Sequence, residues 1–149
     1  MCIRDSDMSV DIAGEKVGNA AAIKMVRSVM IKGLEALTTE CFLAATRAGV
    51  EPQIFISLGK SFPGLDWPEM VEYNLERMAN HGIRRAHEME EVAETLKELG
   101  IEPHMTSGTI QRQYEMGELG KHEPMKSAID KGRLAMLDAI PYADGDKRD

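Results

Sequence analysis

The chemistry of this chain is expected at a lysine near the start of a long apolar stretch. Lys24 follows a run of small residues that opens with Gly18 and Asn19. The N-terminal end of a helix carries partial positive charge, which disfavours the ammonium form of a nearby lysine. A lysine that releases its proton more easily can serve as a general acid or base. We therefore predict that Lys24 exchanges a proton with a bound substrate.

Two further polar residues lie within one helical turn of this lysine. Arg27 and Ser28 follow Lys24 by three and four residues, so the three side chains can share one face of a helix. A guanidinium binds a carboxylate through charge-assisted hydrogen bonds, and a hydroxyl group can donate or accept one. The spacing therefore indicates a site where a small acid could bind beside the proton carrier.

The same residues have structural interpretations that need no ligand. Lysines near helix starts are commonly solvated surface groups, and Arg27 could pair with an acid of residues 66–102. Gly18 and Asn19 could form only a turn and a helix cap. The sequence has no phosphate-binding glycine fingerprint, no serine nucleophile elbow and no histidine pair at the helical spacing that zinc prefers. We therefore expect no metal site.

The element that would hold these residues is a long helix. Apolar residues recur at steps of three or four, which is the period of a helix with one apolar face. We call this set the apolar stripe: Ile23, Val26, Met30, Leu34, Leu37, Cys41, Ala44 and Ala48. The stripe predicts a helix of roughly 30 residues, about 45 Å long, whose apolar side faces a core. Cys41 is then expected to be a small core residue.

Shorter helix signals follow along the chain. Pro52 can occupy the first turn of a short helix, and Asp66 with Glu69 has the spacing of a capping box. Gly82 could end that helix or mark a bend, and Gly100 has the place of a C-terminal cap. Further apolar periodicity predicts helices that end near residue 118 and before residue 141. We therefore expect an all-α, multi-helix domain built around one long N-terminal helix.

The chain is expected to divide into four parts. Residues 1–7 are predicted to be a non-native or disordered leader. Residues 8–14 alternate like a short strand, and residues 8–17 would be the end of an absent upstream domain, or a linker. Residues 18–140 would form the helical domain, and residues 141–149 a disordered tail.

Composition limits the classes of function. The chain has 149 residues, of which 43% are hydrophobic and 29% charged, and this favours one globular domain. A formal net charge of −7 argues against a nucleic-acid binder. Two cysteines make a disulfide framework unlikely, and the sequence shows no membrane span and no signal peptide. We therefore expect a soluble cytoplasmic protein.

The order of these motifs resembles a known family. Residues 18–24, the long helix after them and residues 48–52 resemble the start of the C-terminal domain of β-hydroxyacid dehydrogenases, which include 3-hydroxyisobutyrate and 6-phosphogluconate dehydrogenases. Residues 84–103 are similar to the phosphogluconate-dehydrogenase-like branch of these C-terminal domains. The resemblance extends from about residue 10 to residue 120.

The resemblance implies a two-domain oxidoreductase. A Rossmann domain, absent from this chain, would bind NAD or NADP, and the helical domain would supply the substrate side. Lys24 matches the family lysine that exchanges a proton with the substrate hydroxyl during hydride transfer. The implied substrate is a small, anionic β-hydroxy acid or a related oxo compound. The family forms dimers through these helices, so a homodimer is expected, and the chain alone should be inactive.

The resemblance also implies residues that line the substrate site. These are Gly18, Asn19, Arg27, Ser28 and His87. Four positions depart from the family pattern and leave the substrate open. Ala20 replaces a second glycine, Ser28 replaces an asparagine, and His87 with Glu88 replaces a lysine and aspartate pair.

Two functions from other classes fit the same sequence. The chain could be a freestanding helical interaction module in which Lys24 has no chemical role. It could also be a small-acid-binding domain without redox activity. A βαβ unit with a glycine fingerprint encoded directly upstream would favour the dehydrogenase.

Overall fold

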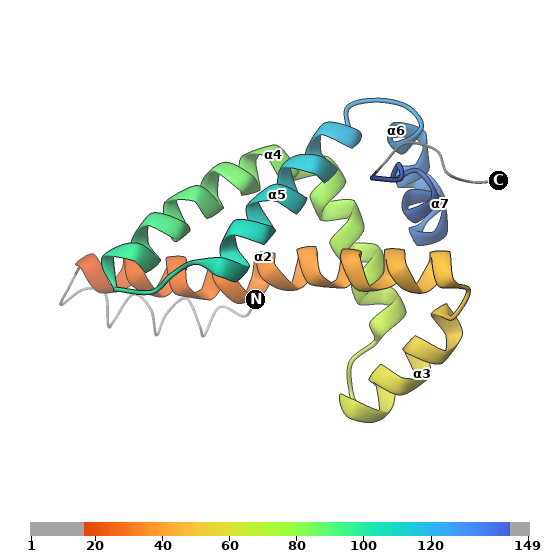
Figure 1. Cartoon of the computed structure of the whole chain (residues 1–149), viewed down its shortest axis with the longest axis horizontal. Coiled ribbons are helices and arrows are strands. Elements are labelled where there is room, and N and C mark those ends of the chain that lie inside the picture. Colours follow the sequence, from red (N-terminus) through yellow and green to blue (C-terminus); the bar gives the residue numbers. More distant parts are fainter. Residues whose placement is uncertain (1–16, 144–149) are drawn as a thin grey trace.

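The computed structural model describes residues 17–143 of the chain, and within that range every regular element is a helix (Figure 1). The elements are α2 (Val17–Ala48), α3 (Glu51–Ser61), α4 (Trp67–Glu98), α5 (His104–Leu119), α6 (Met125–Ala128), a 3-10 turn η1 (Ile129–Lys131) and α7 (Arg133–Asp138). The expected all-α fold with a long first helix is confirmed. The predicted leader, the predicted strand at residues 8–14 and residues 144–149 of the predicted tail lie outside the described residues.

Two helices of 32 residues each, α2 and α4, set the shape of the molecule. Figure 1 shows that α4 bends partway along, so that its first part crosses α2 and its second part lies with α5 above the N-terminal half of α2. The short helices α6 and α7 lie at the other end, near the C-terminal half of α2. No helix in the described range is long and apolar enough to cross a membrane.

The ends of α4 follow from local sequence. The Asp66 side chain accepts a hydrogen bond from the Glu69 N–H at 3.1 Å, and Pro68 lies in the first turn, as predicted. At the other end Gly100 has a φ of 77°. Its N–H and that of Ile101 each donate at 2.9 Å to carbonyls of the last turn, which is the Schellman arrangement. The predicted glycine cap is therefore confirmed.

Glycines let α4 and α5 approach each other closely. Gly82 lies inside α4, which continues through it, so the expectation that it might end the helix is wrong. A methyl group on Gly82 would clash with the Gln113 carbonyl oxygen and lie 2.7 Å from the Gly117 nitrogen. Gly117 meets the backbone of α4 just as closely. Only residues without a side chain fit at this crossing.

The apolar stripe of α2 does not face the core, and this corrects the sequence-based expectation. Val26, Met30 and Leu37 are 51%, 62% and 63% exposed, and Cys41 is exposed rather than a core residue. The buried face of α2 carries instead Ser28, Glu35, Ala36, Thr38, Thr39, Phe42 and Ala45. Helical periodicity identifies an apolar face but not the face that other helices cover. Here α4 and α5 cover the more polar one.

The close contact between α4 and α5 predicts how a methyl group added at Gly82 changes the stability of the fold. Gly82→Ala should lower the free energy of unfolding by at least about 2 kcal/mol, because the new methyl group meets backbone that cannot rotate away. Gly108→Ala in α5 is the matched control, since nothing lies within 4 Å of its added methyl group. It should be neutral or stabilising by up to about 1 kcal/mol. Urea unfolding measures both, and equal effects would contradict the close approach.

Candidate functional site

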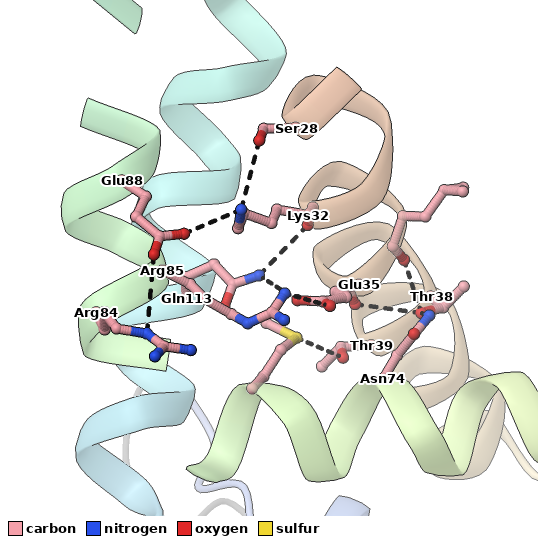
Figure 2. Close-up of polar contacts among 12 residues, drawn as sticks. Ser28, Lys32, Glu35, Thr38, Thr39, Asn74, Arg84, Arg85, Glu88 and Gln113 are labelled. Carbon is pink, nitrogen blue, oxygen red and sulfur yellow. Dashed lines mark hydrogen bonds and ion pairs between the residues drawn. The ribbon is translucent and has the colours of Figure 1, made fainter. Parts of the chain in front are cut away.

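Polar side chains from three helices meet where α2, α4 and α5 pack together (Figure 2). In Figure 2 they point toward one another from facing helices. We call this set the polar seam: Ser28, Lys32 and Glu35 of α2, Arg85 and Glu88 of α4, and Gln113 of α5.

The centre of the polar seam is a buried ion pair. Arg85 Nη1 donates to Glu35 Oε2 at 2.6 Å, and the two side chains are only 10% and 3% exposed. Gln113 Nε2 donates to the other carboxylate oxygen, Oε1, at 2.9 Å. Both oxygens of Glu35 are therefore bound, one by each neighbouring helix. A buried carboxylate needs such partners, so the three helices have to pack together for it to be accommodated.

A second ion pair lies one turn away. Lys32 Nζ is 3.0 Å from Glu88 Oε2 and donates to Ser28 Oγ at 3.4 Å. Burial raises the pKa of the Glu88 carboxyl group, but the hydrogen bond from Lys32 and the positive charges of Lys32, Arg84 and Arg85 outweigh it. The pKa of Glu88 is therefore lower than its ordinary value, and the carboxylate stays ionised at neutral pH.

The two pairs have opposite polarity. Lys32 on α2 meets an acid on α4, whereas Glu35 on α2 meets a base on α4. The pairing of 32 with 88 and of 35 with 85 shows that the helices run antiparallel here. A slip of one turn would set Lys32 against Arg85 or Glu35 against Glu88. The charges therefore allow only one register between α2 and this part of α4.

The predicted catalytic lysine lies on the same helix, before the polar seam. Lys24 is exposed and is the eighth described residue of α2, so it lies about two turns from the helix start. The helix dipole acts within the first turn, and the dipole argument made from sequence does not reach this position. Ser28 Oγ donates to the Lys24 carbonyl oxygen at 3.0 Å, which links the lysine's turn to the seam.

The other predicted substrate residues are distributed over two places. Gly18, Asn19 and Arg27 are exposed on the N-terminal half of α2, with Lys24. The side chains of Lys24 and Arg27 have no ion pair or hydrogen bond with another described residue, so the pairing of Arg27 with an acid of residues 66–102 is not formed. Their roles stay predictions.

His87 points away from the polar seam toward α5. Its ring packs edge-on against Tyr114, with centroids 5.3 Å apart, and its Nδ1 is 3.0 Å from the tyrosine oxygen. The Tyr114 hydroxyl donates to Glu90 at 2.8 Å, and this hydrogen bond raises the pKa of the tyrosine. Glu88, the next residue after His87, is the one that faces α2.

Sequence analysis missed the residues that the structure brings together, although a signal was present. Lys32, Glu35, Arg85 and Gln113 were not singled out, and Glu88 was noted only beside His87 as a departure from the family pattern. On α2 the polar positions 24, 28, 32 and 35 recur at steps of four, four and three, which is a second helical face. Periodicity alone does not show which of the two faces other helices cover, so the apolar stripe was the expected buried face.

An apolar groove lies on the outer side of α2, against α5. It has a volume of about 380 Å³ and is lined mainly by Val29, Met30, Leu34, Leu37 and Met105. Met105 is 80% exposed. The groove continues the apolar stripe, so the exposed apolar surface extends over both helices. Among residues 17–143, no three His, Cys, Asp or Glu side chains are grouped as a metal site requires.

The comparison with known proteins finds a matching family model. Residues 45–116 match the family described as "Domain of unknown function (DUF1932)". No curated protein matches the chain.

Two solved structures are similar. A conserved hypothetical protein from Sinorhizobium meliloti 1021 is 36% identical, with a TM-score of 0.76 over 83% of this chain. The conserved protein MTH1747 of unknown function, described as structurally similar to 3-hydroxyacid dehydrogenases, is 36% identical, with a TM-score of 0.59 over 68% of this chain. The chain spans 40% and 38% of these two proteins. The expected resemblance to the helical domain of hydroxyacid dehydrogenase-like proteins is confirmed.

The buried pair makes the second prediction. Glu35→Gln should lower the free energy of unfolding by about 3 kcal/mol, because it leaves the Arg85 guanidinium buried without a counter-charge. Urea unfolding at neutral pH measures the change.

The matched control is another acid on the same helix. Glu40 pairs with Arg112 at 2.7 Å, but its side chain is 69% exposed. Glu40→Gln should therefore cost less than about 1 kcal/mol. If Glu35→Gln cost no more than Glu40→Gln, the buried pair would not have the structural role assigned to it.

Proposed function

We propose that this chain is the substrate and dimerisation domain of a two-domain, NAD(P)-dependent oxidoreductase. The substrate would be a small, anionic β-hydroxy acid or a related oxo compound. The observation that carries the proposal is the similarity, at 36% identity, to a protein described as resembling 3-hydroxyacid dehydrogenases. Since this chain spans 38% to 40% of its two structural relatives, such a protein has room for a nucleotide-binding domain.

The described residues fit the substrate side of such an enzyme and not the dinucleotide side. They contain no strand followed by a glycine-rich turn, so they supply no cradle for the pyrophosphate. Lys24 and Arg27 are exposed and unpaired among the described residues, which leaves both available to a ligand at this face. A nicotinamide, when bound by the other domain, would exchange hydride with the substrate carbon.

Within this arrangement the lysine handles the proton. Lys24 would take the hydroxyl proton of the substrate as its carbon is oxidised, and would return that proton in the reverse direction. Arg27, three residues later, would hold a substrate carboxylate. Gly18, at the start of α2, would let the backbone approach the ligand, and Asn19 beside it would line the same site. His87, whose ring lies against Tyr114, would be the remaining substrate residue.

The third prediction concerns Lys24. In the longer protein that carries the nucleotide-binding domain, Lys24→Ala should lower turnover of a β-hydroxy acid by about a hundredfold or more, as loss of a general acid or base does. Formation of NADH or NADPH, followed by absorbance over a panel of small hydroxy acids, measures turnover. Dinucleotide binding, measured by fluorescence, should be unchanged.

Lys60 offers a control, because it is an exposed lysine on α3. Lys60→Ala should leave turnover unchanged. Wild-type turnover in Lys24→Ala would remove the catalytic assignment. Stabilisation of the 149-residue chain by carboxylates in a thermal melt, without any hydroxy-acid oxidation by the longer protein, would indicate an acid-binding domain instead.

The dimer is proposed to form across the exposed apolar surface of α2. Ile23, Met30 and Leu37 are spaced by seven residues and are 41%, 62% and 63% exposed. A seven-residue apolar repeat suits packing against another helix, and in a two-fold dimer each copy supplies the same surface. The groove between α2 and α5 would receive side chains of the partner.

The fourth prediction follows. The wild-type chain should sediment as a dimer, and the double variant Met30→Glu with Leu37→Glu should sediment as a monomer, because charges cannot be buried unpaired in an apolar interface. Ile56→Glu on α3, where the side chain is 61% exposed, is the control and should stay dimeric. A monomeric wild-type chain, or a dimeric double variant, would contradict this interface.

A further inference from the structure

We infer that Lys32 and Glu88 are positioning residues for Lys24 and act on it through Ser28. The inference rests on the proposed function, because it assumes that Lys24 is the proton carrier. The contacts form one continuous chain, part of which is drawn in Figure 2. It runs from Glu88 Oε2 to Lys32 Nζ over 3.0 Å, to Ser28 Oγ over 3.4 Å, and to the Lys24 carbonyl oxygen over 3.0 Å.

The hydrogen bonds of Ser28 assign its role. A serine hydroxyl has one proton to donate and two lone pairs to accept with. Ser28 donates its proton to the Lys24 carbonyl and accepts from Lys32, and only 9% of the residue is exposed. It has no proton left for a substrate oxygen. An asparagine amide, which the resemblance places at this position, carries two donors and is less committed. In this chain Ser28 therefore holds the helix turn of Lys24.

Lys32 is held firmly enough to transmit position. Its side chain is 13% exposed, which is low for a lysine, and its ammonium group bridges Ser28 and Glu88. Glu88 is in turn supported by Arg84 Nε at 3.8 Å. One turn further along α2, the buried pair of Glu35 with Arg85 fixes the same two helices. The ammonium group therefore connects the Lys24 turn to a part of α4 that the buried pair also holds against α2.

Position matters for a proton carrier. The Lys24 amine and the substrate hydroxyl must lie close together and be aligned, and a displacement of about 1 Å can reduce the rate by up to about a hundredfold. Lys24, Ser28 and Lys32 are spaced by four residues and so lie along one face of α2. Loosening the Lys32 contact would allow the first turns of α2 to move relative to α4. Arg27 lies on the same turn, but a charge-assisted contact with a carboxylate tolerates a small displacement better than a proton transfer does, so substrate affinity would change less than turnover.

The test compares kcat and KM in the longer protein. Lys32→Met and Ser28→Ala should each lower kcat by about tenfold, with KM changed by less than about threefold. Ser28→Thr should keep most of kcat, because a threonine hydroxyl also bonds the carbonyl four residues earlier. Lys97→Met is the matched control, since Lys97 pairs with Glu94 at an exposed site on α4, and its kcat should equal wild type.

Charge exchange separates positioning from folding. Lys32→Glu alone should lower kcat, and adding Glu88→Lys should restore most of it by remaking the pair with its polarity reversed. In the 149-residue chain, Lys32→Met removes the ammonium group and leaves the helix propensity nearly unchanged, so it should speed amide hydrogen exchange in the first turns of α2 but not in α5. This measurement does not depend on catalytic activity. A merely structural contact would not give a rescue of kcat at unchanged KM.

The outcomes distinguish the two claims. If Lys24→Ala abolishes turnover while Lys32→Met and Ser28→Ala keep wild-type kcat, the positioning role is overturned and the proposed function stands. If Lys24→Ala itself turns over at the wild-type rate, both are overturned, because Lys24 then has no reaction to be positioned for. Unchanged hydrogen exchange in Lys32→Met would also overturn the positioning role.

Discussion

Two ion pairs of opposite polarity between α2 and α4 are the constraint on which the rest of the structure depends. Glu35 with Arg85 and Lys32 with Glu88 admit one register, because a slip of one turn would bring like charges together. Gln113 adds α5 to the same carboxylate. Packing of apolar side chains alone tolerates small shifts, whereas a buried charge does not. The polar seam therefore decides how three helices are placed relative to one another.

This register explains which surfaces remain open. With the polar face of α2 covered by α4 and α5, the apolar stripe is left outside together with the groove toward α5. The part of α2 before the polar seam carries Lys24 and Arg27, and both side chains are exposed. The domain therefore presents an exposed apolar surface on α2 and α5 and an exposed surface that carries the basic side chains of Lys24 and Arg27. Other parts of a larger assembly could complete each surface, and the proposed function requires such an assembly.

Much of the fold could be predicted from local signals, and the orientation of the first helix could not. The cap at Asp66 and the glycine end at Gly100 depend on residues close in sequence, and both are found as predicted. The buried face of α2 depends on Arg85, whose partner is 50 residues away. A charged residue such as Glu35 is ordinarily assigned to the surface, and only its partners make it a core residue.

The candidate site, like the fold, could be predicted from the sequence only in part. Spacing correctly placed Ser28 next to Lys24 on one helix, but its contact with Lys32 and Glu88 depends on the register between two helices. The most direct test of that register is a double-mutant cycle by urea unfolding on Glu35→Met and Arg85→Met. The account predicts that the double variant is more stable than either single variant, because neither charge is then left buried alone. Losses that simply add would contradict it.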